Sequence, residues 1–112
     1  MNISRRAIFV LFMAAFGLLL GTATHGAADK PDGLELFKAN CAMCHGADGK
    51  GFEALKTPNF TSPKWQDSVK DSQILDAIKN GKKDTAMVGF ADKLSIKEML
   101  AVLQQIRAFR GK

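Results

Sequence analysis

Cys41-Ala42-Met43-Cys44-His45 holds the only two cysteines of this 112-residue chain, and a histidine follows the second cysteine directly. An apolar pattern leads into this stretch, because Leu34, Phe37 and the first cysteine recur at three- and four-residue steps. The pattern predicts a helix over about 32–44 with these residues on one face. Residues three and four apart share a helix face, so both thiols and the imidazole are expected to point to the same side. The stretch therefore predicts a single site.

Two thiols and an imidazole at this spacing are the attachment signature of a c-type haem. Cys41 and Cys44 would bond one edge of the porphyrin, and His45 would reach the iron as an axial ligand. Three other interpretations are a thioredoxin-like redox pair, a zinc site and a plain disulfide. A redox pair would open a helix after a strand, zinc would need a fourth ligand, and a disulfide leaves His45 without a role. We therefore predict one covalently bound haem c.

The first 28 residues differ from the rest of the chain. Two arginines at positions 5 and 6 precede an apolar run from Ala7 to Leu20, and small residues follow as far as Ala28. This order is typical of a secretory signal peptide, and the run is shorter than the roughly 18 apolar residues of a spanning helix. We expect cleavage after Ala28 or, as the alternative, after Ala23; an uncleaved membrane anchor is the other interpretation. Either way residues 29–112 form the exported domain, in the periplasm or otherwise outside the cytoplasm.

The basic charge of the chain argues little about its partners. Without the two N-terminal arginines, 14 of the 16 Lys and Arg remain against 11 Asp and Glu, a net charge of +3. Two haem propionates would nearly cancel that excess. No basic stripe with interleaved aromatic residues is present, so no nucleic-acid partner is predicted.

Two further helices are predicted after the motif. Residues 71–80 have a cap at Asp71 or Ser72, a left-handed stop at Gly81, and an apolar stripe formed by Ile74, Leu75 and Ile78. A Ser-x-x-Glu capping box at Ser95 begins the last helix, which is expected to run until Gly111 with the stripe Met99, Val102, Leu103, Ile106 and Phe109.

No segment after residue 28 alternates clearly enough to predict a strand. The segment from His45 to Lys70 is predicted as a loop of about 26 residues, which is long for a compact domain. We interpret it as chain wrapped around a large group that the sequence does not encode. A domain this small also has little apolar surface to bury, and a covalently held macrocycle would supply core and crosslinks.

The chain resembles the class I monohaem cytochromes c over nearly all of residues 29–112. The matching motifs are Gly33-x-x-x-Phe37, Asn40 to Gly46, Asp48-Gly49-Lys50-Gly51, Asn80-Gly81-Lys82, Met87-x-x-Phe90, Leu94-Ser95 and Ile106-Arg107. The resemblance implies a small all-α fold of three main helices and long loops around one covalent haem.

The second axial ligand is expected to be a methionine. His45 is the only histidine after residue 28, so the sixth position falls to methionine, to water or to nothing. Met43 lies between the cysteines, and Met99 lies on the stripe of the last helix. Met87 lies in the Gly- and Lys-rich loop where the family places its ligand, and we predict that it binds the iron. Val88 follows it, where the family usually has proline.

The resemblance also assigns roles around the site. In the family a loop proline carbonyl accepts the second N–H of the axial histidine, and Pro58 is the matching residue. Trp65 is expected to form a wall of the haem pocket, with its N–H near a propionate, or to pack in the core. Gln105 stands where the family often has an aromatic residue near Gly33 and Phe37, which predicts a looser crossing of the first and last helices.

An iron held by histidine and methionine has no open position for a substrate, and the chain has no constellation of general acid, base or nucleophile. We therefore predict an exported, soluble one-electron carrier and not an enzyme. Two alternatives are a small-ligand sensor or weak peroxidase, should Met87 not be a stable ligand, and an electron-transfer subunit of a larger oxidoreductase. The predicted partners are redox proteins. Lys79, Lys82 and Lys83 would attract a partner whose surface is acidic. A membrane is a partner only if the N-terminal segment stays uncleaved.

Overall fold

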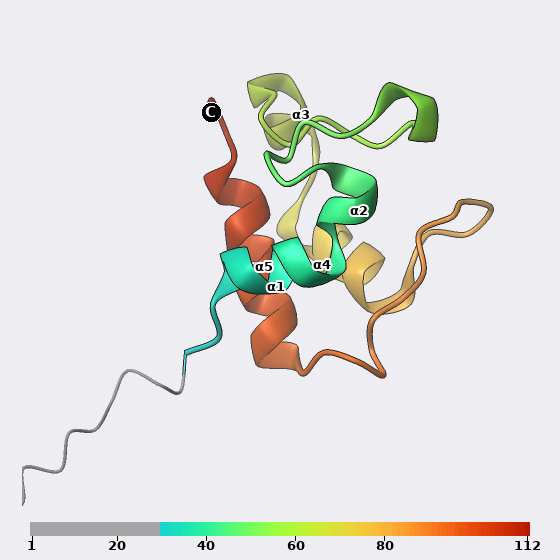
Figure 1. Ribbon diagram of the computed structural model, residues 1–112, viewed down its shortest axis with the longest axis vertical. Helices are drawn as coiled ribbons and strands as arrows, with labels where there is room; N and C mark the ends of the chain where they lie inside the picture. The colour runs from blue at the N-terminus through green and yellow to red at the C-terminus, as the bar shows by residue number, and fades with distance from the viewer. Residues whose placement is uncertain (1–29) are drawn as a thin grey trace, which may run out of the picture.

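The computed structural model describes residues 30–112, and the predicted signal peptide lies outside them. The described chain is helical (Figure 1). Its elements are α1 (Gly33–Asn40), α2 (Ala42–His45), the 3-10 helix η2 (Glu53–Leu55), α3 (Pro63–Ser68), α4 (Asp71–Asn80) and α5 (Ile96–Ala108). Within residues 30–112 no strand forms, and the only extended pairing is an isolated antiparallel bridge between Gly81 and Val88. The predicted all-α fold is confirmed.

The first and last helices cross at the centre of the domain, where α1 lies across α5 (Figure 1). A β-carbon on Gly33 would overlap the carbonyl oxygen of Ala101 and would lie 2.8 Å from its carbon. Only glycine allows two backbones to approach this closely. Gln105 does lie beside Gly33, since its Cβ is 3.3 Å from the same point. The two backbones therefore touch at Gly33, and the prediction of a crossing looser than in the family stays a prediction.

The apolar stripe of α5 forms the centre of the core. All five predicted residues are buried, together with Phe37 from α1 and with Ile74 and Ile78 from α4. The capping box forms as predicted, because Glu98 N–H donates to the Ser95 hydroxyl at 3.3 Å and Ser95 N–H donates to the Glu98 carboxylate at 2.7 Å. On the predicted apolar face of the first helix, Phe37 is buried, whereas Leu34 is 37% exposed and lies outside the core.

Helix α4 has the predicted bounds but a different cap. The Lys70 N–H donates to the side-chain oxygen of Gln73 at 2.8 Å, and this bond replaces the predicted cap at Asp71 or Ser72. Gly81 ends the helix with φ of 75°, in the left-handed region that favours glycine. The helix therefore ends at the predicted glycine, but the ψ of Gly81, −171°, lies outside the αL region of a left-handed stop.

The predicted long loop between the motif and α4 contains two helical elements, η2 and α3. Helix α3 begins at Pro63 because the Ser62 hydroxyl accepts the Trp65 N–H at 3.3 Å and proline suits the first helical position. Both elements are shorter than two turns, and periodicity does not reveal elements of that length. The loop prediction was therefore wrong in its interior.

Among the described residues, no helix is both long enough and apolar enough to cross a bilayer.

Candidate haem-binding site

The cysteine motif lies on one helical turn, although the helix before it breaks at Cys41. The chain leaves α1 at Cys41 (φ −119°, ψ −30°) and starts α2 at the next residue. The N–H groups of Cys44 and His45 both donate to the Cys41 carbonyl, at 3.2 and 2.9 Å. The predicted continuous helix is therefore wrong, but the turn that joins the first thiol to the imidazole is present. The two thiols are not bonded to each other, and Cys41 is half-buried while Cys44 is exposed.

The environment of Cys41 disfavours the alternative chemistries. Burial, and next the neighbouring Cys44, raise the pKa of the Cys41 thiol from 9.0 to about 11. Redox-active cysteines and zinc ligands are thiolates and have lowered pKa values. Within residues 30–112 no group of three or more His, Cys, Asp or Glu side chains could hold a metal ion. A neutral thiol packed against the core fits a thioether bond better than either alternative.

His45 is a neutral imidazole with free coordinating capacity. Its burial lowers its pKa below 6.5, so the ring carries no charge at neutral pH, as a metal ligand must. The Phe60 ring stacks on it, with centroids 4.9 Å apart and planes inclined by 19°. Its Nδ1 is buried and has no hydrogen-bond partner. Because Nδ1 is enclosed by protein, it is the nitrogen left for a carbonyl such as that of Pro58, and the other ring nitrogen, Nε2, which makes no hydrogen bond within residues 30–112, is left for a metal. The residues present fit a haem.

Pro58 lies beside the backbone of His45 but does not bond its ring. The Gly51 N–H donates to the His45 carbonyl at 2.8 Å, and a β-carbon on Gly51 would lie 2.7 Å from the Pro58 carbonyl oxygen. The two segments are therefore adjacent. The hydrogen bond from His45 to this carbonyl is not formed, so that role of Pro58 stays a prediction.

Trp65 belongs to an aromatic cluster behind the imidazole. The centroids of the Trp65 and Phe60 rings lie 4.8 Å apart, and their planes are inclined by 52°. The Phe60 ring in turn packs edge-on against Phe37, with the two ring centroids 6.1 Å apart. Trp65 is half-buried and packs against the core, which agrees with the core-packing alternative.

Sequence reasoning missed Gln66, which holds Phe60 in place. Gln66 is buried, and its side-chain amide donates to the carbonyls of Phe60 and Ile106 at 2.7 and 2.8 Å. The Arg107 guanidinium donates to the Gln66 carbonyl at 2.8 Å, to its side-chain oxygen at 2.9 Å and to Val69 and Asp71. The chain from Arg107 through Gln66 to Phe60 therefore supports the ring that stacks on His45. No pattern in the sequence indicated this role, because the bond to Ile106 joins residues 40 apart.

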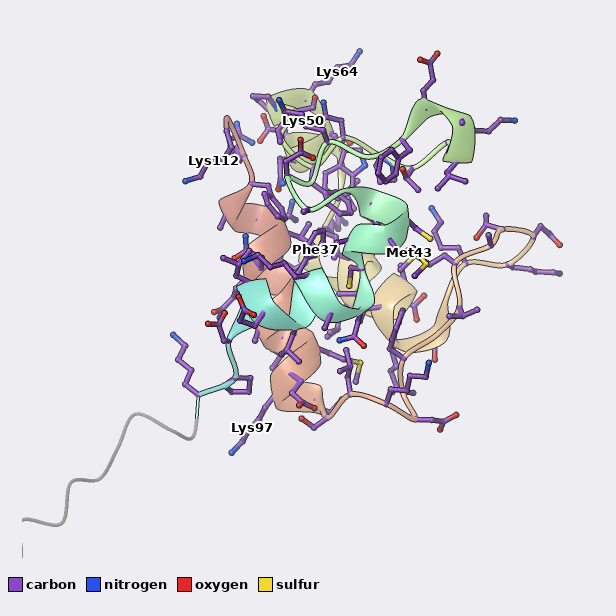
Figure 2. The ribbon with its side chains drawn as sticks, viewed as in Figure 1. Phe37, Met43, Lys50, Lys64, Lys97 and Lys112 are labelled. Atoms are coloured by element: carbon purple, nitrogen blue, oxygen red, sulfur yellow. The ribbon has the colours of Figure 1, made fainter. Side chains whose placement is uncertain are left out.

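Met87 lies in the segment 81–89 after α4, which we call the ligand loop. Its backbone is paired, because Lys82 N–H donates to the Met87 carbonyl at 3.0 Å. Met43, labelled in Figure 2, is 89% exposed and lies on α2 between the two cysteines that would bind the haem. Met99 is 2% exposed in the core, as predicted. Of the three methionines in the described chain, Met87 is thus the one on a loop and neither in the core nor inside the motif.

Comparison with known proteins places this geometry in a family. A family model described as "Cytochrome C oxidase, cbb3-type, subunit III" matches residues 28–104. That match, the helical fold and the Cys-x-x-Cys-His turn define a class I c-type cytochrome. The chain belongs to the family that this model describes. Membership implies a haem c cofactor and a role in electron transfer.

Two curated relatives and two solved structures illustrate the likeness. The cbb3-type cytochrome c oxidase subunit FixP of Azorhizobium caulinodans is 38% identical over 83% of this chain, and the subunit CcoP of Rubrivivax gelatinosus is 35% identical over 74%. The matched segment spans 31% and 27% of these proteins, respectively. The structure of the KustC0563 c-type cytochrome is 32% identical, with a TM-score of 0.65 over 70% of this chain and 98% of that one. The dihydro-heme d1 dehydrogenase NirN is 28% identical, with a TM-score of 0.60 over 68% of this chain and 16% of that one.

Proposed function

We propose that residues 29–112 form a one-electron carrier domain with a single haem c. In this proposal Cys41 and Cys44 bind the haem through thioethers, and His45 and Met87 are its axial ligands. The observation that carries the proposal is an imidazole whose Nε2 makes no hydrogen bond within the described residues, one helical turn away from two free thiols.

A bound haem c supplies a couple between ferric and ferrous iron. The residues of the chain determine how that couple behaves. His45 presents an uncharged ring nitrogen, and the Phe60 ring covers one of its faces. Met87, as the sixth ligand, would fill the last position and exclude substrates. This arrangement supports electron transfer and no bond-making reaction.

Exposed apolar side chains support a bound macrocycle. The large apolar side chains that are between 45% and 89% exposed include Met43 on α2, Phe52 and Leu55 around η2, and Val88 in the ligand loop. Large apolar side chains left exposed in several neighbouring segments mark a binding surface. An apolar ring bonded at the motif is the kind of group that covers such a surface.

The proposed carrier is exported and soluble. The signal-peptide pattern of residues 1–28 supports passage out of the cytoplasm and, in a bacterium, a periplasmic location. The KustC0563 cytochrome, of which this chain covers 98%, is a precedent for a single domain of this size. The exposed Lys79, Lys82 and Lys83 beside the ligand loop would favour an acidic redox partner.

A second candidate is a component of a terminal oxidase. The family model and the FixP and CcoP relatives favour it, because those relatives are subunits of cbb3-type oxidases. Purification from native membranes and from the periplasmic fraction distinguishes the two. A carrier is recovered alone in the soluble fraction, whereas an oxidase component is recovered with other haem-containing subunits.

The ferric absorption spectrum of Met87→Ala holoprotein tests the ligand assignment. The wild type is expected to show a methionine–iron charge-transfer band, and the variant is expected to lose it and to have a lower reduction potential. Met43→Ala is the matched control and is expected to keep the band. A high-spin wild-type spectrum would support the sensor or peroxidase alternative instead.

A further inference from the structure

The ligand loop is fixed at its stem. Gly81 and Val88 form an antiparallel bridge. In addition, the Phe90 N–H donates to the Ile78 carbonyl of α4 at 2.9 Å. The stem also lies against the end of α4, since a β-carbon on Gly89 would be 2.6 Å from a carbonyl oxygen of that helix. The freedom that remains lies in the tip, residues 82–87, of which Met87 is half-buried and the others are exposed.

One side chain restrains that tip. Within the part of the chain that the structure describes, Thr85 is the only residue of the ligand loop whose side chain forms a hydrogen bond. Its hydroxyl donates to the Lys82 carbonyl at 2.7 Å and accepts the Met87 N–H at 3.2 Å. The Thr85 N–H donates to the same carbonyl at 3.2 Å. The hydroxyl therefore connects the first residue of the tip to Met87.

The backbone of the tip needs such a restraint. Asp84 has φ of 59°, a left-handed conformation that aspartate tolerates in turns but that does not fix the neighbouring residues. Val88 does not lock its own φ, as a proline would. Neither residue limits how far the Met87 backbone can move. The Lys82 N–H holds the Met87 carbonyl, and the Thr85 hydroxyl is the side-chain group that holds the Met87 N–H.

We propose that Thr85 is a positioning residue for Met87: its hydroxyl holds the Met87 backbone so that the sulfur stays directed at the iron. The inference rests on the proposed function, in which Met87 is the sixth ligand. Thr85 is exposed. Water can therefore replace its hydroxyl as a partner, and global stability changes little when it is removed. Removal of the hydroxyl therefore weakens the restraint on the ligand loop and on Met87, and leaves the rest of the fold unchanged.

Binding of free imidazole to the ferric holoprotein tests this role, because imidazole competes with Met87 for the sixth position. Thr85→Val removes the hydroxyl at nearly constant shape and is expected to bind imidazole about tenfold more tightly, the effect of losing two modest hydrogen bonds. Thr85→Ser keeps the hydroxyl and is expected to match the wild type. Thr57→Val is the control, because the Thr57 hydroxyl bonds the Phe52 backbone in the same paired way, at 2.7 and 3.3 Å, outside the ligand loop.

Amide hydrogen exchange gives a second readout that does not involve the iron. The Met87 amide is expected to exchange about tenfold faster in Thr85→Val and at the wild-type rate in Thr85→Ser. If Met87→Ala binds imidazole more tightly than the wild type but Thr85→Val does not, the positioning role is overturned while the ligand assignment stands. A gain in Thr57→Val equal to that in Thr85→Val would also overturn it. Equal imidazole affinity in the wild type and Met87→Ala would instead overturn the ligand assignment.

Discussion

Replacement of Gln66 by leucine tests whether the buried amide holds the segment behind His45. The Gln66 side chain donates two neutral hydrogen bonds, to Phe60 and Ile106, and accepts one from the Arg107 guanidinium. Neutral bonds contribute about 1 kcal/mol each and a charge-assisted bond about 2 kcal/mol, so the gross loss is about 4 kcal/mol. The greater apolarity of leucine offsets about 1 kcal/mol of that. The expected loss of unfolding free energy is about 3 kcal/mol.

Thermal and urea unfolding of the holoprotein measure this loss. For a domain of this size about 3 kcal/mol corresponds to a fall in Tm of roughly 12 to 24 °C. Gln104→Leu, on the exposed side of α5, is the matched control and is expected to stay within about 0.5 kcal/mol of the wild type. If Gln66→Leu unfolds within about 0.5 kcal/mol of the wild type, the Gln66 bonds do not support the segment.

Two further substitutions test other parts of the fold. Gly33→Ala is expected to destabilise by about 2 kcal/mol in urea titrations, because its methyl group would overlap the Ala101 backbone. An alanine usually stabilises a helix by about 1 kcal/mol over glycine, so a gain in stability would refute the close crossing. Asp67→Asn tests the ion pair with Arg110, whose hydrogen bond holds the pKa of the Asp67 carboxyl below 3.8. A carboxyl with a lowered pKa stabilises the fold above its ordinary pKa and loses this effect as the pH falls through the lowered pKa. The variant should therefore be less stable at neutral pH, and its deficit should shrink as the pH falls below 3.8. A deficit that persists in acid would contradict this.

The sequence predicted the parts of the fold that depend on local patterns. The apolar stripe of α5 repeats every three or four residues after a capping box, and the C-terminal end of α4 follows from Gly81. The motif predicted which residues meet at the site, because it spans a single turn. The short helix α3 has local start signals in Ser62 and Pro63, but its six residues are too few to form a periodic stripe, and no signal in the sequence marks the break at Cys41.

The support behind His45 was equally invisible in the sequence. Gln66 bonds a carbonyl forty residues later in the chain, and a lone glutamine in a predicted loop carries no sign of such a partner. Thr85 is a similar case, because its role depends on the turn that brings Met87 N–H to its hydroxyl. Residues that bind a group directly have recognisable types and spacings, whereas the residues that hold them in place do not.

Intact-mass measurement of the protein purified from its native exported location tests the central claim most directly. We expect the polypeptide without residues 1–28, heavier by one haem that denaturation and acid extraction do not remove, with the added mass on the peptide that contains Cys41 and Cys44. A polypeptide whose two cysteines carry free thiols, or a bond to each other, would contradict the account.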